Sequence, residues 1–171
     1  MSAAAPPAMR PVIRPPLFGD TIHASVMDCE SLPWLPLTSF SPTVRVKHFR
    51  LDPISGEMVS LIRAPAGARM PCLQHTASAL VYTLEGHWKF AEHEWIASPG
   101  SMVHIPPQSC HQAEFLDGPD GTLTLHITSG DVHLIDDELS QQSVLNWKTA
   151  LGRYLAYCQT HCIAPLDLTA P

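Results

Sequence analysis

Histidine is the residue whose type and placement first suggest chemistry in this chain. The sequence of 171 residues holds ten histidines. Seven of them fall in one stretch: His75, His87, His93, His104, His111, His126 and His133. Imidazole is a common transition-metal ligand and the usual acid or base near neutral pH. This stretch is therefore the place to expect a metal site or an acid–base site.

Two of these histidines, His75 and His111, lie in distinctive surroundings. His75 ends the segment GARMPCLQH and is followed by ALVYTLEG, while His111 ends the segment GSMVHIPPQSCH. In their spacing the two regions resemble the paired motifs of the cupin family. Within that family the wording VYTLEGHW and WIASPGS is most similar to the 2,4'-dihydroxyacetophenone dioxygenase and ChrR-like group. The resemblance spans about residues 34–137.

The resemblance implies a fold, an activity and a cofactor. It implies an all-β cupin barrel, the double-stranded β-helix or jelly roll, and an enzyme that acts on a hydroxylated ketone, a diketone or a polyketide-like molecule. In a metal-binding cupin the two motifs together supply three His and one Glu, a set that suits Fe, Mn, Ni or Zn. Here the register places Leu73 at the first His and Ala79 at the Glu, so only His75 and His111 remain.

This reduced ligand set leaves three functions open. We favour acid–base catalysis by His75 and His111 without a metal, as in an isomerase, cyclase or lyase. The first alternative is an iron-dependent dioxygenase that cleaves a C–C bond next to a carbonyl. Because catalytic metals usually need three protein ligands, it would recruit His104 or His126 as a further ligand. The second alternative, which the ChrR-like resemblance also implies, is a ligand-binding or sensor module without catalysis.

Side chains on the same strands should complete a mostly apolar pocket for a small molecule. Residues two apart in a strand share a face, so Leu73 lies on the same side as His75. The candidate substrate-binding residues are Leu73, Ala79, Val81, His104, Phe115 and His126. Alternation alone leaves open whether His104 and His126 face the interior. Five other histidines are expected at the surface: His23, His48, His87, His93 and His161.

Short strands must position these residues. Runs rich in β-branched and aromatic residues, separated by Pro, Gly and Asp turn signals, occur at 44–51, 58–63, 80–84, 88–90, 102–105, 113–115, 123–128 and 132–135. This pattern predicts an antiparallel barrel or sandwich. After residue 136 apolar residues recur every three or four positions, which predicts a helix over about 143–161 with Ser140 or Ser143 as its cap. Cys158 and Cys162 on that stripe are expected in the core.

Composition sets the remaining expectations. Of 17 prolines, five lie in the first 16 residues, which predicts an extended arm over residues 1–33 before the barrel (34–137) and a C-terminal helix and tail (138–171). A net charge of −6 without basic runs argues against nucleic acid, and no apolar run reaches the length of a membrane span. Five irregularly spaced cysteines do not indicate a complete disulfide framework. We expect a cytoplasmic homodimer, because a second subunit commonly covers strands and arms at a barrel edge.

Overall fold

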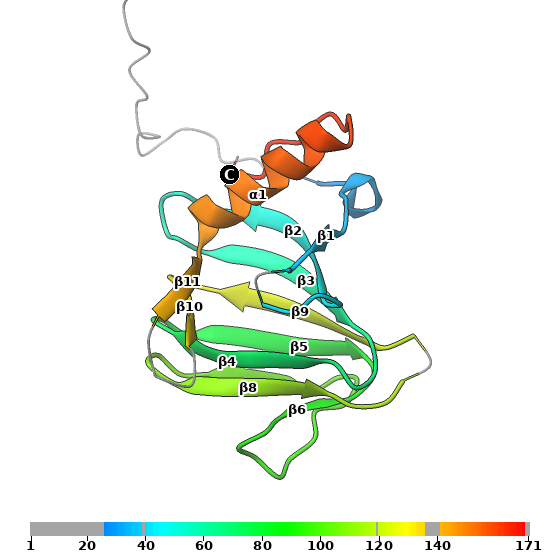
Figure 1. Cartoon of the computed structure of the whole chain (residues 1–171), viewed down its shortest axis with the longest axis vertical. Helices are drawn as coiled ribbons and strands as arrows, with labels where there is room; N and C mark the ends of the chain where they lie inside the picture. The colour runs from blue at the N-terminus through cyan, green and yellow to red at the C-terminus, as the bar shows by residue number, and fades with distance from the viewer. Residues whose placement is uncertain (1–25, 39, 119, 136–140, 170–171) are drawn as a thin grey trace, which may run out of the picture.

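Two antiparallel β-sheets face each other and form the body of the protein (Figure 1). This computed structural model describes residues 26–38, 40–118, 120–135 and 141–169. Helix α1 (Trp147–Thr160) follows the last strand. Among the described residues, no helix is long and apolar enough to cross a membrane. Most of the arm predicted for residues 1–33 lies outside the described residues.

The strand order confirms the predicted all-β barrel. The first sheet, in spatial order, contains β1 (Leu35–Pro36), β2 (Arg45–Leu51), β3 (Met58–Ala64), β9 (Thr122–Thr128), β5 (Ala79–Glu85) and β7 (Met102–Ile105). The second sheet contains β11 (Gln141–Leu145), β10 (Val132–Ile135), β4 (Arg69–His75), β8 (Cys110–Phe115) and β6 (Trp88–Phe90). All of these pairings are antiparallel. The eight predicted runs are all present, with small differences at their ends.

The core lies between the sheets because side chains alternate along each strand. In β5, Ala79, Val81 and Thr83 are buried, whereas Leu80 and Leu84 are exposed. The hydroxyl of Thr83 is satisfied in this apolar setting, since it accepts a hydrogen bond of 2.9 Å from the indole Nε1 of Trp88 in the other sheet. Packing of the buried side chains and this hydrogen bond therefore both join the two sheets.

The C-terminal segment differs from the prediction. Residues Gln141–Leu145 form β11, which pairs with β10, so Ser143 lies in a strand and does not cap the helix. The cap is Asn146, whose side chain accepts from the Thr149 N–H at 3.0 Å while the Thr149 hydroxyl accepts from the Asn146 N–H. The spacing of the apolar residues predicted too early a start for the helix, because the spacing continues without a break from the strand into the helix. The other predicted cap, Ser140, lies outside the described residues.

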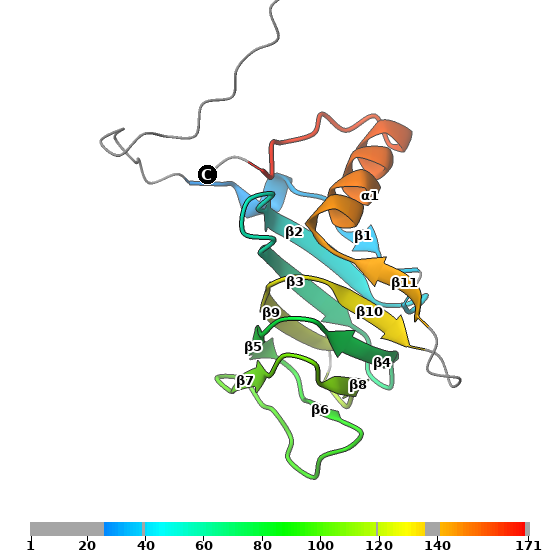
Figure 2. The ribbon, with the colours of Figure 1, turned by 90° about the vertical axis from the view of Figure 1, so that its left-hand side faces the viewer.

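Helix α1 lies over β2 of the first sheet and β11 of the second sheet, on one side of the barrel (Figure 2). Its inward face buries Ala150, Tyr154 and Cys158, as expected for Cys158. Cys162 follows the end of the helix and is exposed, so the expectation of a core position for it is wrong. The helix thereby covers one side of the barrel and leaves the opposite side, at β6 and β7, uncovered by it.

Strand β4 was anticipated only as the strand that carries Leu73 and His75. Pro71 interrupts its sequence pattern, and its pairing with β8 shifts register between Arg69 and Cys72. The structure also joins the two strands by a disulfide between Cys72 and Cys110, a pairing that the irregular cysteine spacing did not indicate. Strand β4 is therefore held by a covalent link beside the stretch where its ladder is irregular.

Gly121 provides a test of how closely the barrel connections pack. Its φ is +76°, and a Cβ built there would overlap the Ala64 carbonyl oxygen. Gly67 has a similar φ of +79° but open space around it. We expect Gly67→Ala to lower the free energy of unfolding by about 1–2 kcal/mol, from backbone conformation alone, and Gly121→Ala by about 3–4 kcal/mol. Urea denaturation of both variants measures the difference, and equal losses would contradict the predicted overlap.

Candidate active site

A cavity of about 90 Å³ lies between the two sheets. Most of its wall is apolar, with side chains such as Phe40, Ile62, Leu73, Val81 and Phe115. Its polar members are His48, Ser60, His75, His111, Thr124, His126 and Thr128. An apolar wall with a few placed polar groups is the usual composition of a small-molecule site.

His75 lies at the end of β4 and is only 8% exposed. Its backbone is fixed on both sides, because its N–H donates to the Ser109 carbonyl and its carbonyl accepts from the Gln108 N–H. The side-chain Nδ1 is buried and has no hydrogen-bond partner among the described residues. Burial, and secondarily the nearby His111, lowers the pKa of His75 from 6.5 to about 4. At neutral pH this imidazole is therefore uncharged.

His111 lies on β8, directly opposite Leu73 of β4. Its ring stacks on the ring of Phe90, with centroids 4.4 Å apart and an interplanar angle of 12°. Like that of His75, its Nδ1 is buried without a hydrogen-bond partner in the described part of the chain. Two imidazoles whose Nδ1 atoms make no hydrogen bond in the described chain therefore contribute to the wall of one cavity.

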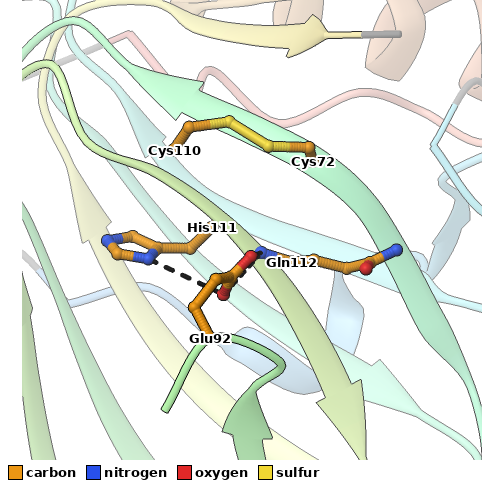
Figure 3. The surroundings of a disulfide bond; sticks show 5 residues. All are labelled: Cys72, Glu92, Cys110, His111 and Gln112. Atoms are coloured by element: carbon orange, nitrogen blue, oxygen red, sulfur yellow. Dashed lines mark hydrogen bonds and ion pairs between the residues drawn. A yellow bond between two sulfur atoms is a disulfide. The ribbon is translucent and has the colours of Figure 1, made fainter. Parts of the chain in front are cut away.

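Glu92 makes the environment of His111 different from that of His75. Its carboxylate accepts a hydrogen bond of 3.0 Å from the Gln112 backbone N–H and lies 3.9 Å from the His111 Nδ1 (Figure 3). Burial lowers the pKa of His111, the Glu92 carboxylate opposes that effect, and His93 adds to the lowering. The carboxylate is thus placed to stabilise His111 when it is protonated.

His126 faces the cavity from the middle of the first sheet. On β9 it stands opposite Ser60 of β3 and Val81 of β5. Its Nε2 is 2.9 Å from the Thr124 hydroxyl, and burial, followed by the effect of His75, lowers its pKa to about 3. The structure thereby settles the orientation that alternation left open for His126.

His104 does not join this group. It pairs with Leu80 across β5 and β7, and both side chains are exposed. Because its neighbour Ile105 is buried, alternation turns His104 outward. The sequence could not settle this point, since His104 and His111 are joined by a turn whose geometry decides which face each residue takes.

His48 was expected at the surface, and this expectation is wrong. It is 4% exposed, lines the cavity and has its Nδ1 2.7 Å from the Ser60 hydroxyl. Burial, and then the charge of Arg153, lowers its pKa to about 4. A signal was present in the sequence, because His48 lies two residues after Val46 and shares its inward face.

The remaining candidates are divided between the cavity wall and its surroundings. Leu73, Val81 and Phe115 line the cavity as predicted, while Ala79 is buried in the core close to it. His87 and His93 are exposed, as expected. Sequence reasoning did not identify Glu92, which lies in the connection after β6 and has no periodic pattern to mark it.

The donor set does not fit the metal site of three His and one Glu that the cupin resemblance implies. Leu73 and Ala79 present hydrocarbon where such a site has imidazole and carboxylate. No three His, Cys, Asp or Glu residues within the described ranges are arranged so that they could hold a metal ion. The imidazoles of His75, His111 and His126 lie on the wall of the same cavity. Among the described residues of that wall there is no Asp or Glu to act as an acidic ligand.

Two facing antiparallel sheets around a cavity, with the motif histidines on its wall, define a cupin-type protein. The chain belongs to the ChrR cupin-like family, because the family model described as "ChrR Cupin-like domain" matches residues 23–132. No curated protein matches the chain.

Solved structures agree with this assignment. An RmlC-like cupin protein from Ralstonia eutropha JMP134 is 38% identical, with 90% of this chain and 98% of that chain covered and a TM-score of 0.83. An acetylacetone dioxygenase from Acinetobacter johnsonii has a TM-score of 0.70 at 18% identity, covering 80% of this chain and 93% of that one. At that identity the second likeness concerns the fold alone.

The buried histidines predict how stability depends on pH. Because the pKa of His48 falls from 6.5 to about 4 on folding, the unfolded chain binds more protons between these values. The free energy of unfolding should therefore fall as pH drops from 7 to 5. His48→Gln should reduce this slope by up to about 1.4 kcal/mol per pH unit. Urea denaturation at pH 7, 6 and 5 measures both slopes, and identical slopes would contradict burial of a neutral His48.

Proposed function

We propose that this cupin is an enzyme that transfers a proton next to the carbonyl group of a small molecule by acid–base catalysis with His75 and His111. The substrate class is a hydroxylated ketone, a diketone or a polyketide-like molecule. The observation that carries the proposal is the placement of two imidazoles on the wall of one apolar cavity: His75, whose buried Nδ1 has no hydrogen-bond partner in the described chain, and His111, whose Nδ1 lies 3.9 Å from the Glu92 carboxylate.

The different surroundings of the two imidazoles assign their roles. His111 is the better base, because Glu92 stabilises the imidazolium that forms when it accepts a proton. His75 has the lower basicity of a deeply buried group and stays neutral. A neutral imidazole N–H is suited to donate a hydrogen bond to an oxygen on which negative charge develops.

The proposed step is an enolisation. His111 takes the proton from the carbon next to the carbonyl, and the electrons of that C–H bond form a carbon–carbon double bond. The carbonyl π electrons move to oxygen, where the His75 N–H stabilises the enolate. Return of the proton from His111 to a carbon of the enolate regenerates the neutral base. When the deprotonated carbon carries a hydroxyl group, the enolate is an enediolate. Transfer of the hydroxyl proton to the former carbonyl oxygen, with return of the carbon-bound proton from His111 to the former carbonyl carbon, gives the isomeric hydroxy carbonyl compound, so no external oxidant or reductant is consumed.

Replacement of either histidine should abolish this step. We expect His75→Ala and His111→Ala to reduce deuterium incorporation into 1-hydroxy-2-propanone in D2O by about 10²-fold or more. Proton NMR of the carbon next to the carbonyl measures the rate. His161→Ala, which removes an exposed histidine far along the chain from both motifs, is the matched control. Rates in both site variants equal to that of the control would overturn the assignment.

Glu92 should set the pH at which His111 can act as a base. Without its carboxylate the pKa of His111 falls, so the base remains neutral to lower pH. We expect Glu92→Gln to move the acidic limb of the kcat/KM profile to lower pH and to reduce kcat roughly tenfold. The glutamine oxygen can still accept from the Gln112 N–H, so a purely structural role predicts no shift of the limb. An unchanged limb would therefore remove Glu92 from the mechanism.

A further inference from the structure

A second hollow lies outside the cavity, where edge strands β6 and β7 of the two sheets approach each other. It has a volume of about 580 Å³ and is more open than the cavity. Its walls include His93, Trp95 and Ile96 from the connection after β6, and Met102 and His104 from β7. We call this hollow the seam groove. It lies on the side of the barrel opposite to α1 (Figure 2).

The seam groove presents apolar surface to solvent. Trp95, Ile96 and Met102 are 38%, 53% and 58% exposed. Of the described residues that line the groove, none is Lys, Arg, Asp or Glu. Among the described lining residues only the histidines His93, His104 and His111 can carry a charge, whereas hydrocarbon bound in the groove would be removed from water. The chemistry of the groove therefore matches an uncharged, apolar ligand.

The seam groove and the cavity share part of their walls. Phe90 and His111 line both spaces, and their rings are stacked 4.4 Å apart. The proposed base thus lies between a small interior space and a larger outer one. A substrate whose reacting carbon is next to His111 therefore has the groove directly beyond the Phe90–His111 pair, and the cavity itself has a volume of only about 90 Å³.

We infer that the seam groove binds an apolar alkyl substituent of the same substrate whose carbonyl group lies between His75 and His111. The inference rests on the proposed function and narrows its substrate class to ketones that carry an extended alkyl chain on one side of the carbonyl. A second copy of the chain is the competing occupant, because the groove lies at a sheet edge and a homodimer is predicted from the sequence.

The size of the effect follows from the burial of hydrocarbon. A fully buried methylene contributes about 0.8 kcal/mol, or roughly fourfold in affinity. Because the groove is open on one side, about twofold per methylene is expected. A ketone with four more methylenes should then bind at least about tenfold more tightly.

The test compares 1-hydroxy-2-propanone with 1-hydroxy-2-heptanone on the full chain, with dissociation constants from NMR titration. We expect the longer ketone to bind at least about tenfold more tightly. The double variant Ile96→Ser, Met102→Ser should bring the ratio of the two constants close to one. Ile54→Ser, which makes the same change at a 91% exposed residue in the β2–β3 turn, should leave the ratio unchanged.

The possible failures separate the two proposals. Equal affinities of the parent chain for the two ketones, each weakened by His111→Ala, would overturn the role of the groove and leave the proposed function standing. Binding of neither ketone would overturn both. Sedimentation of the double variant addresses the competing occupant: loss of a dimer, with the ratio unchanged, would identify the groove as a subunit interface and overturn the inference.

Discussion

The structure depends on uncharged imidazole groups held inside an apolar space between two sheets. Burial disfavours their protonated forms and lowers the pKa of His48, His75 and His126 to between about 3 and about 4. His48 and His126 each have a hydroxyl partner, on Ser60 and Thr124 respectively. The Nδ1 atoms of His75 and His111 have no hydrogen-bond partner in the described chain, although that of His111 lies 3.9 Å from the Glu92 carboxylate. The cavity therefore favours a neutral ligand that can supply the missing hydrogen bonds.

His75 and His111 have different properties because they lie at different places in the barrel. His75 lies deep at the end of β4, with its backbone bonded to the turn before β8, whereas His111 lies at the side where the seam groove opens. A single acidic residue, Glu92, reaches His111 from the connection after β6 (Figure 3). The Cys72–Cys110 disulfide links the two strands that carry these histidines. In the proposed mechanism, these different surroundings assign the role of base to His111 and that of hydrogen-bond donor to His75.

The sequence predicted the parts of this arrangement that follow from regular spacing. The motif register selected His75 and His111 as candidates. Of the apolar candidates, Leu73, Val81 and Phe115 line the cavity, whereas Ala79 does not. Irregular features could not be read in this way. The turn at Pro106 and Pro107 decides that His104 faces outward, and Glu92 lies in a connection without periodicity. The inward position of His48, by contrast, follows from its alternation with Val46 and could have been predicted. The helix start was misplaced because the apolar residues of β11 continue the spacing of α1.

In the proposed function, His75 and His111 move a proton without a metal ion. The most direct measurement is the rate of deuterium incorporation into 1-hydroxy-2-propanone by protein before and after removal of divalent metals with a chelator, with metal content determined by elemental analysis. We expect the same acceleration in both preparations. An acceleration that disappears with the metal and returns with about one equivalent of Fe(II), together with oxygen uptake, would contradict this expectation.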